Sequence, residues 1–101
     1  MGSGIKVPVV DRSGAYTIYY EGLDTPIGLM TFVHCDLHTA WSRHIKHKLR
    51  DDFKSLLALR IDPLYCLRHD HKQEKFIRMF GFRYSYAIPD HGLDVYILEN
   101  K

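Results

Sequence analysis

Histidine and aspartate side chains alternate at the end of a strongly apolar stretch. His34, Asp36 and His38 are two residues apart, so an extended chain places their side chains on one face. His69 and His71 follow a second apolar stretch, and parallel neighbouring strands would bring both groups to the carboxyl edge of one sheet. Imidazoles beside a carboxylate are suited to Zn²⁺ or another divalent metal, and each such group is also a candidate general base.

The spacing of these histidines matches no established metal motif. The chain has seven histidines, and the alternative interpretation is that they are surface or interface residues, some of which tune a contact with pH. His34, Asp36 and His38 are therefore only candidate catalytic residues, and His34, His38, His69 and His71 only candidate metal ligands.

A basic run begins where a helix is expected to start. Arg43, Lys46, His47, Lys48 and Arg50 fall within about two turns, and the first acids follow them. Cations at a helix N-terminus oppose the macrodipole by about 0.3–1 kcal/mol each, so stability alone would favour acids there. The functional interpretation is a phosphate-facing surface for a nucleotide, CoA or nucleic acid, and the alternative is a solvated polar face.

The two cysteines and the single tryptophan have simpler interpretations. Cys35 and Cys66 lie inside apolar runs, where a buried thiol is normally inert. Two cysteines imply no disulfide framework and fit a reducing compartment. Trp41 begins an apolar helical stripe and is expected to anchor the helix against the sheet.

Three strands are predicted in the first part of the chain. Ile5–Val10 is rich in β-branched residues, but Pro8 restricts it to an edge or an irregular strand. Ala15–Tyr20 is dense in β-branched and aromatic residues, and residues 21–26 are expected to end that strand. Ile27–Cys35 is apolar at nearly every position near its end, as expected of a central strand.

A long amphipathic helix and a short strand follow. The helix is predicted from apolar residues at four-residue steps, namely Trp41, Ile45, Leu49, Phe53 and Leu57. Thr39 is its expected N-cap, with Ser42 as the second choice. Leu64–Arg68 is a short apolar strand, and strand, helix and strand most simply form a right-handed parallel βαβ unit.

The last third is predicted to contain a short helix and a hairpin. Asp70 and Gln73 have capping-box spacing, and Gly81 fits the C′ position that ends the helix. Arg83–Ile88 and Leu93–Leu98 are expected to pair as antiparallel strands. The predicted fold is α/β, a mixed sheet with the order β-β-β-α-β-α-β-β.

The bulk properties predict one soluble domain. The chain has 101 residues with 46% hydrophobic residues and a net charge of +2, so residues 5–101 are expected to form a single domain. Residues 1–4 are expected to be a disordered start or a cloning remnant. No apolar run reaches the roughly 18–20 residues of a membrane span and no signal peptide opens the chain, so a cytoplasmic location is expected.

Residues 75–82, KFIRMFGF, combine a short helix, a terminating glycine and an aromatic strand start. With the preceding Leu64–Arg68 strand and the layout from Gly28 to Leu98, this stretch resembles the GNAT acyltransferase superfamily, here in truncated form. The chain is more narrowly similar to short GNAT-like proteins of tailed bacteriophages, including internal virion proteins, in which a strand leads into a Trp-containing basic helix. The resemblance implies an N-acyltransferase fold and acetyl-CoA as the cofactor if the protein is active.

Three departures from the family pattern argue that catalysis has been lost. The family's glycine-containing pyrophosphate loop corresponds to residues 36–43, which contain no glycine. The position of a frequent general-acid tyrosine is Ile77, which cannot donate a proton, and that of a frequent asparagine is Asp70. If the coenzyme is bound nevertheless, Thr39, Ser42, Arg43 and Lys46 are the candidate contacts.

We therefore expect a catalytically degenerate GNAT-like domain that binds another protein and needs no cofactor. The resemblance implies a phage protein, either a virion component or a modulator of a host protein, in the host cytoplasm or the virion. The candidate partner-binding residues are Arg43, His47, Lys48 and Arg50. The alternatives are an active CoA-dependent N-acyltransferase and, further, a nucleic-acid-binding protein or a metal-dependent hydrolase. A homodimer formed by strand addition near Ile5–Val10 is a further expectation.

Overall fold

The computed structural model describes residues 5–25, 28–68, 71–88 and 92–99, without the side chains of residues 71–74. Three expectations lie outside these described residues: the disordered start at residues 1–4, the capping box of Asp70 and Gln73, and the turn at residues 89–91. The candidate metal ligand His69 and the side chain of His71 also lie outside them.

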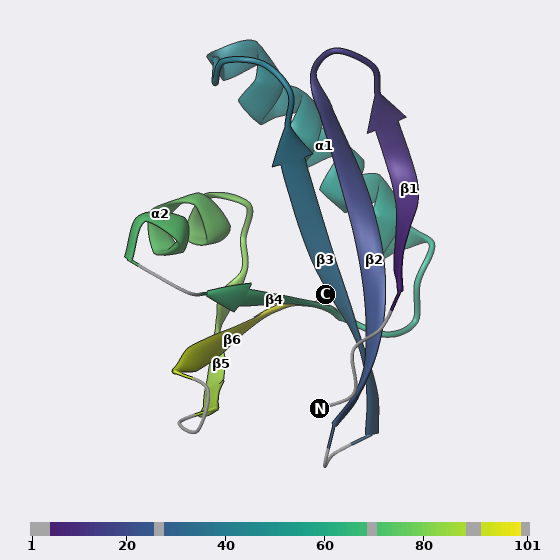
Figure 1. The fold of residues 1–101 in the computed structure, drawn as a ribbon, viewed down its shortest axis with the longest axis vertical. Coiled ribbons are helices and arrows are strands. Elements are labelled where there is room, and N and C mark those ends of the chain that lie inside the picture. The colour runs from purple at the N-terminus through teal and green to yellow at the C-terminus, as the bar shows by residue number, and fades with distance from the viewer. Residues whose placement is uncertain (1–4, 26–27, 69–70, 89–91, 100–101) are drawn as a thin grey trace.

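Six strands and two helices make up the fold (Figure 1). Their bounds are β1 Lys6–Arg12, β2 Tyr16–Thr25, β3 Gly28–Leu37, α1 Arg43–Ala58, β4 Leu64–Arg68, α2 His71–Met79, β5 Arg83–Ile88 and β6 Leu93–Leu98. The strands form one sheet in the order β1-β2-β3-β4-β6-β5. Because β3 and β4 are parallel and the other neighbours antiparallel, the sheet is mixed, and the predicted α/β class is confirmed.

The hairpin of β2 and β3 is longer than predicted. Residues 21–25 continue β2 instead of ending it, and the pairing runs from Tyr16 opposite Leu37 to Thr25 opposite Gly28. Leu23, in the stretch expected to be a break, is only 6% exposed. Cross-strand pairing and burial of Leu23 therefore outweigh the weak strand preference of Gly22 and Asp24.

The N-cap of helix α1 lies three residues after the first expected cap. Its N-cap is Ser42, whose hydroxyl oxygen accepts a hydrogen bond from the Ile45 amide at 3.2 Å, so the prediction of Thr39 is wrong and the second choice is confirmed. Trp41 accordingly precedes the helix and remains 41% exposed. It does not anchor α1 to the sheet as expected, because it lies outside the helical stripe.

Gly81 ends α2 as predicted. Its φ of +90° lies in the left-handed region that only glycine adopts easily. Its amide donates to the Arg78 carbonyl at 3.0 Å, and the chain enters β5 two residues later.

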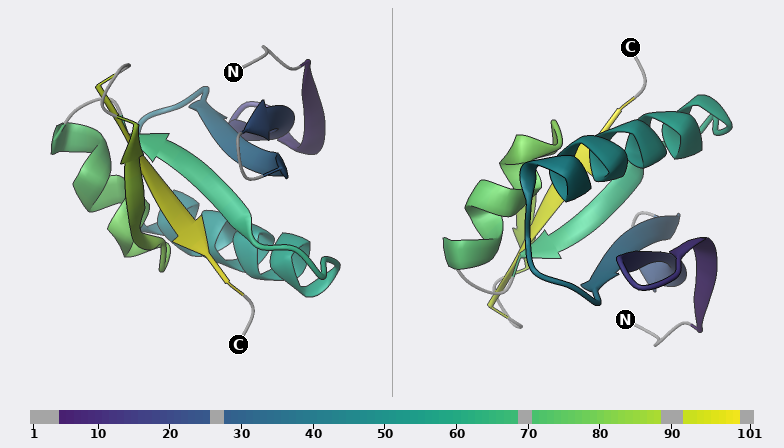
Figure 2. Two further views of the ribbon diagram at one scale, coloured as in Figure 1. Left: turned by 90° about the horizontal axis from the view of Figure 1, so that it is seen from below. Right: turned by 90° about the horizontal axis from the view of Figure 1, so that it is seen from above.

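Both helices cover the same face of the sheet (Figure 2). One apolar cluster joins Leu49 and Phe53 of α1 and Phe80 after α2 to Tyr16 and Leu64 of the strands. A second cluster without a helix lies on the opposite face and consists of Leu23, Met30, Phe32 and Val95. Neighbouring residues along β3 belong alternately to the two clusters, so the core lies on both sides of that central strand.

Strand β1 is an edge strand with built-in irregularity. Pro8 lies in it, and its pairing with β2 shifts register between Pro8 and Val10. A proline and a bulge are the features that natural edge strands use against further strand pairing. The edge position expected from Pro8 is confirmed, and the bulge disfavours the expected dimerisation by strand addition at this edge.

Candidate functional site

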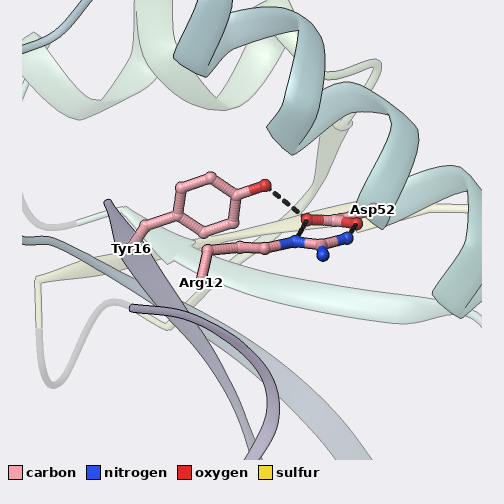
Figure 3. A network of polar contacts seen from close by, with 3 residues as sticks. All are labelled: Arg12, Tyr16 and Asp52. Atoms are coloured by element: carbon pink, nitrogen blue, oxygen red, sulfur yellow. Dashed lines mark hydrogen bonds and ion pairs between the residues drawn. The ribbon is translucent and has the colours of Figure 1, made fainter. Parts of the chain in front are cut away.

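A buried carboxylate ties α1 to the beginning of the sheet (Figure 3). Asp52 is 7% exposed and accepts hydrogen bonds from the Arg12 guanidinium at 2.7 and 3.2 Å. The hydroxyl of the fully buried Tyr16 donates to the same carboxylate. Because no buried side-chain polar atom of the described residues lacks a partner, the network fastens the helix to β1 and β2 and has a structural role.

The network shifts the pKa values of its members in opposite directions. Burial, together with the hydrogen bond to Asp52, raises the pKa of Tyr16 above its ordinary value. Burial also acts to raise the pKa of Asp52, but the hydrogen bonds from Arg12 and Tyr16 outweigh it, so this pKa is lowered. The sequence contained one signal for the network, since Asp52 occupies a position of the apolar stripe three residues after Leu49.

The amino end of α1 is closed by side chains. The Ser42 hydroxyl oxygen accepts the hydrogen bond of the Ile45 amide. The residues from Asp36 to Ser42 contain no glycine that would leave backbone amides uncovered. The ring of Trp41 packs edge-on against Phe76 of α2 at 5.2 Å and against Phe80 at 6.4 Å. A diphosphate bound at a helix N-terminus needs free, accessible amides, and this arrangement offers few.

The cations of α1 form no ion pair in the described part of the chain, although the charge of Lys48 helps to lower the pKa of Asp52. None of its basic residues forms an ion pair or hydrogen bond with another described side chain, namely Arg43, Lys46, Lys48, Arg50 and Lys54. No acid lies in the first turn to balance them. The candidate contacts Arg43, His47 and Lys48 are exposed, and Lys46 and Arg50 are half-buried.

A cleft of about 290 Å³ lies where β3 and β4 separate. The two strands share a single registered pair, Phe32 with Tyr65, and then diverge (Figure 1). The polar part of the lining comes from Lys6 of β1 and from His34 and Asp36 of β3, and the thiols of Cys35 and Cys66 face the cleft beside them. The remaining wall is apolar and includes Ile77, which is 5% exposed and presents only hydrocarbon to the cleft.

The imidazoles of the candidate catalytic residues His34 and His38 contact side chains of strand β2. The Nε2 atom of His34 lies 2.7 Å from a carboxylate oxygen of Glu21, and the Nε2 atom of His38 lies 2.8 Å from the Thr17 hydroxyl. These contacts direct the two imidazoles to different partners. Among the residues that the structure describes, no three His, Cys, Asp or Glu side chains form a group able to hold a metal ion.

The thiols in the cleft are poor nucleophiles. Burial raises the pKa of Cys66 to about 11, and burial with the nearby Asp36 raises that of Cys35 to about 12. Since the thiolate is the reactive form, both side chains act as apolar wall, in agreement with the inert role expected of Cys66.

Comparisons with protein-family models, with curated proteins and with solved structures found no match to this chain. Within the described ranges, no helix is long and apolar enough to cross a membrane. Inferences about function therefore depend on the geometry of the site and on the sequence resemblance.

Proposed function

We propose that this chain is a protein-binding module built on a GNAT-like scaffold that no longer uses acetyl-CoA. The observation that carries the proposal is the amino end of α1, where Ser42 caps the helix and Trp41 packs onto Phe76. The resemblance would place the coenzyme phosphates at this end of the helix, where the Ser42 hydroxyl already accepts the hydrogen bond of the Ile45 amide. The resemblance to phage proteins makes a virion or host protein the partner that we propose.

The unpaired cations beside this closed end support binding of a macromolecule. Three basic side chains on one flank of this helix, Arg43, Lys46 and Arg50, form no ion pair among the described residues and contribute little to folding. Exposed arginines and aromatics are the side chains that dominate protein interfaces.

Thermal unfolding with and without acetyl-CoA tests the proposal. A ligand present at 100 times its dissociation constant stabilises a protein by about 2.7 kcal/mol, which a melting curve detects readily. We expect no change in the melting temperature at millimolar acetyl-CoA. A saturable rise at micromolar acetyl-CoA contradicts the proposal.

The cleft between β3 and β4 supports a second candidate, an active N-acyltransferase. His34, oriented by Glu21, lies at its lining and would serve as general base. Transfer of an acetyl group to an amine, lost in His34→Gln and in the charge reversals Arg43→Glu and Lys46→Glu, would establish this candidate in place of the first. Retention of transfer in these variants excludes the roles given to these residues.

A further inference from the structure

A shallow apolar groove of about 320 Å³ lies between the end of β3 and α2. It is lined by Leu37, Trp41, Phe76, Met79 and the stem of Lys75. Leu37 and Trp41 are each 41% exposed, an unusual exposure for two large apolar side chains placed together. Leucine, methionine and tryptophan at one site offer a surface that suits an inserted apolar side chain.

One cation lines this groove, and further cations lie on the flank of α1 that faces α2. Lys75 lies on the α2 side and is exposed. On α1, Arg43, Lys46, Arg50 and Phe53 have the spacing i, i+3, i+7 and i+10, which places them along one flank of the helix. The Phe53 ring packs against Phe80 at 5.2 Å, so this flank is the one that faces the end of α2.

The charge of these four cations is not neutralised by an ion pair among the described side chains. Arg43, Lys46, Arg50 and Lys75 form no ion pair with any side chain in the described ranges. The positive charge around an apolar groove is complementary to an apolar side chain flanked by carboxylates. This charge complementarity is what identifies the chemistry of the occupant.

We propose that the groove binds an acidic segment of another protein, with one large apolar side chain placed against Trp41 and carboxylates on Lys75 and the Arg43–Lys46 turn. The inference rests on the proposed function and names its binding site and partner chemistry. The aliphatic contribution of Leu37 and Met79 favours a protein segment over nucleic acid, whose bases bind mainly by stacking on aromatic rings.

The chain provides its own reporter for this site, because Trp41 is its single tryptophan. The probe is a short synthetic peptide of glutamates around one central leucine, titrated while Trp41 emission is recorded. We expect a saturable blue shift at about millimolar peptide or below, because the inserted leucine removes water from the indole. The same peptide with lysines in place of glutamates, or with serine in place of leucine, should give no shift.

Matched charge reversals locate the site on the protein. Arg43→Glu and Lys75→Glu should weaken binding about tenfold or more, an effect expected of residues at the centre of an interface. Lys54→Glu makes the same change of net charge, but Lys54 lies 11 residues, or about 16 Å, along the helix from Arg43, so binding should change by less than about threefold. Melting curves of all three variants confirm that each is folded.

Several results overturn the inference. An unchanged Trp41 emission with the glutamate–leucine peptide does so, as does an equal loss of binding in Lys54→Glu and Arg43→Glu. A salt-sensitive shift with a single-stranded oligonucleotide, without one for the peptide, identifies the surface as a nucleic-acid site instead. Because the acetyl-CoA melting experiment is independent of the peptide, failure at the groove is distinguishable from failure of the proposed function.

Discussion

The two sides of α1 obey different requirements. The side facing the sheet buries Leu49 and Phe53 and directs its one charged residue, Asp52, into a complete set of hydrogen bonds with Arg12 and Tyr16. The rest of its surface carries five cations that form no ion pair among the described residues, and its first turn lacks the acids that would stabilise it. The first side is organised for folding, and the second is available for binding.

The positions of the unpaired cations support this comparison of the two sides of α1. Two of them, Lys46 and Arg50, are half-buried on the flank near α2, where a charged side chain benefits most from a partner. A bound acidic segment would supply that partner. The comparison predicts that changes to the two sides alter different properties of the protein.

The largest loss of stability should come from the buried apolar residues of α1. Leu49 is fully buried, and Leu49→Ala should lower the free energy of unfolding by about 2–5 kcal/mol because it leaves a cavity. Urea unfolding measures this difference. The matched control is Ser55→Ala on the exposed side, which should stay within about 0.5 kcal/mol of the wild type. Similar effects for the two variants would remove the distinction between the sides.

Removal of the buried carboxylate should have the next largest effect. Asp52→Ala leaves the buried Tyr16 hydroxyl without its acceptor and should lower the free energy of unfolding by about 1–3 kcal/mol. In a double-mutant cycle with Tyr16→Phe, the two changes should be less than additive, since either one removes the same hydrogen bond. Strict additivity would show that the two groups do not interact.

Because the pKa of Asp52 is lowered in the folded protein, we expect the stability to depend on pH. The folded-state pKa of Asp52 is lowered, so its contribution is fully present above the ordinary aspartate pKa of about 4 and is lost as the pH falls through the folded value. The difference in free energy of unfolding between the wild type and Asp52→Asn should therefore shrink as the pH falls below about 4. A difference that stays constant over that range rules out this linkage.

The smallest effect should have the opposite sign. Arg43→Glu replaces a cation with an anion at the amino end of α1 and should raise the free energy of unfolding by about 0.3–1 kcal/mol. The chemical denaturation midpoint at low salt measures the gain, which should decrease as salt is added. A destabilised Arg43→Glu variant would indicate that Arg43 has a structural role and is not held available for a partner.

The sequence predicted much of the secondary structure because local signals were strong. Gly81 specifies the end of α2 through its left-handed conformation, and Pro8 restricts β1 to an edge. The extension of β2 to Thr25 depended on pairing with β3 and on burial of Leu23, which no local pattern contains. Tertiary packing decided that boundary.

The sites were harder to predict than the strands. The parallel pairing of the strands that carry His34 and Cys66 was predicted correctly, but the cleft between them follows from the divergence of β3 and β4. The groove at Trp41 was missed because periodicity placed that residue in the helical stripe, one residue before the Ser42 cap. The signal that the sequence offered was Ser42, the second N-cap candidate, directly after Trp41.

Titration of acetyl-CoA with Trp41 emission as the readout tests the central claim most directly. Trp41 adjoins the Ser42 cap, so a coenzyme diphosphate at the amino end of α1 could not bind without altering its surroundings. We predict an emission spectrum that stays unchanged to millimolar acetyl-CoA. A saturable change at micromolar concentration would contradict the claim that this end of the helix has been closed to the coenzyme.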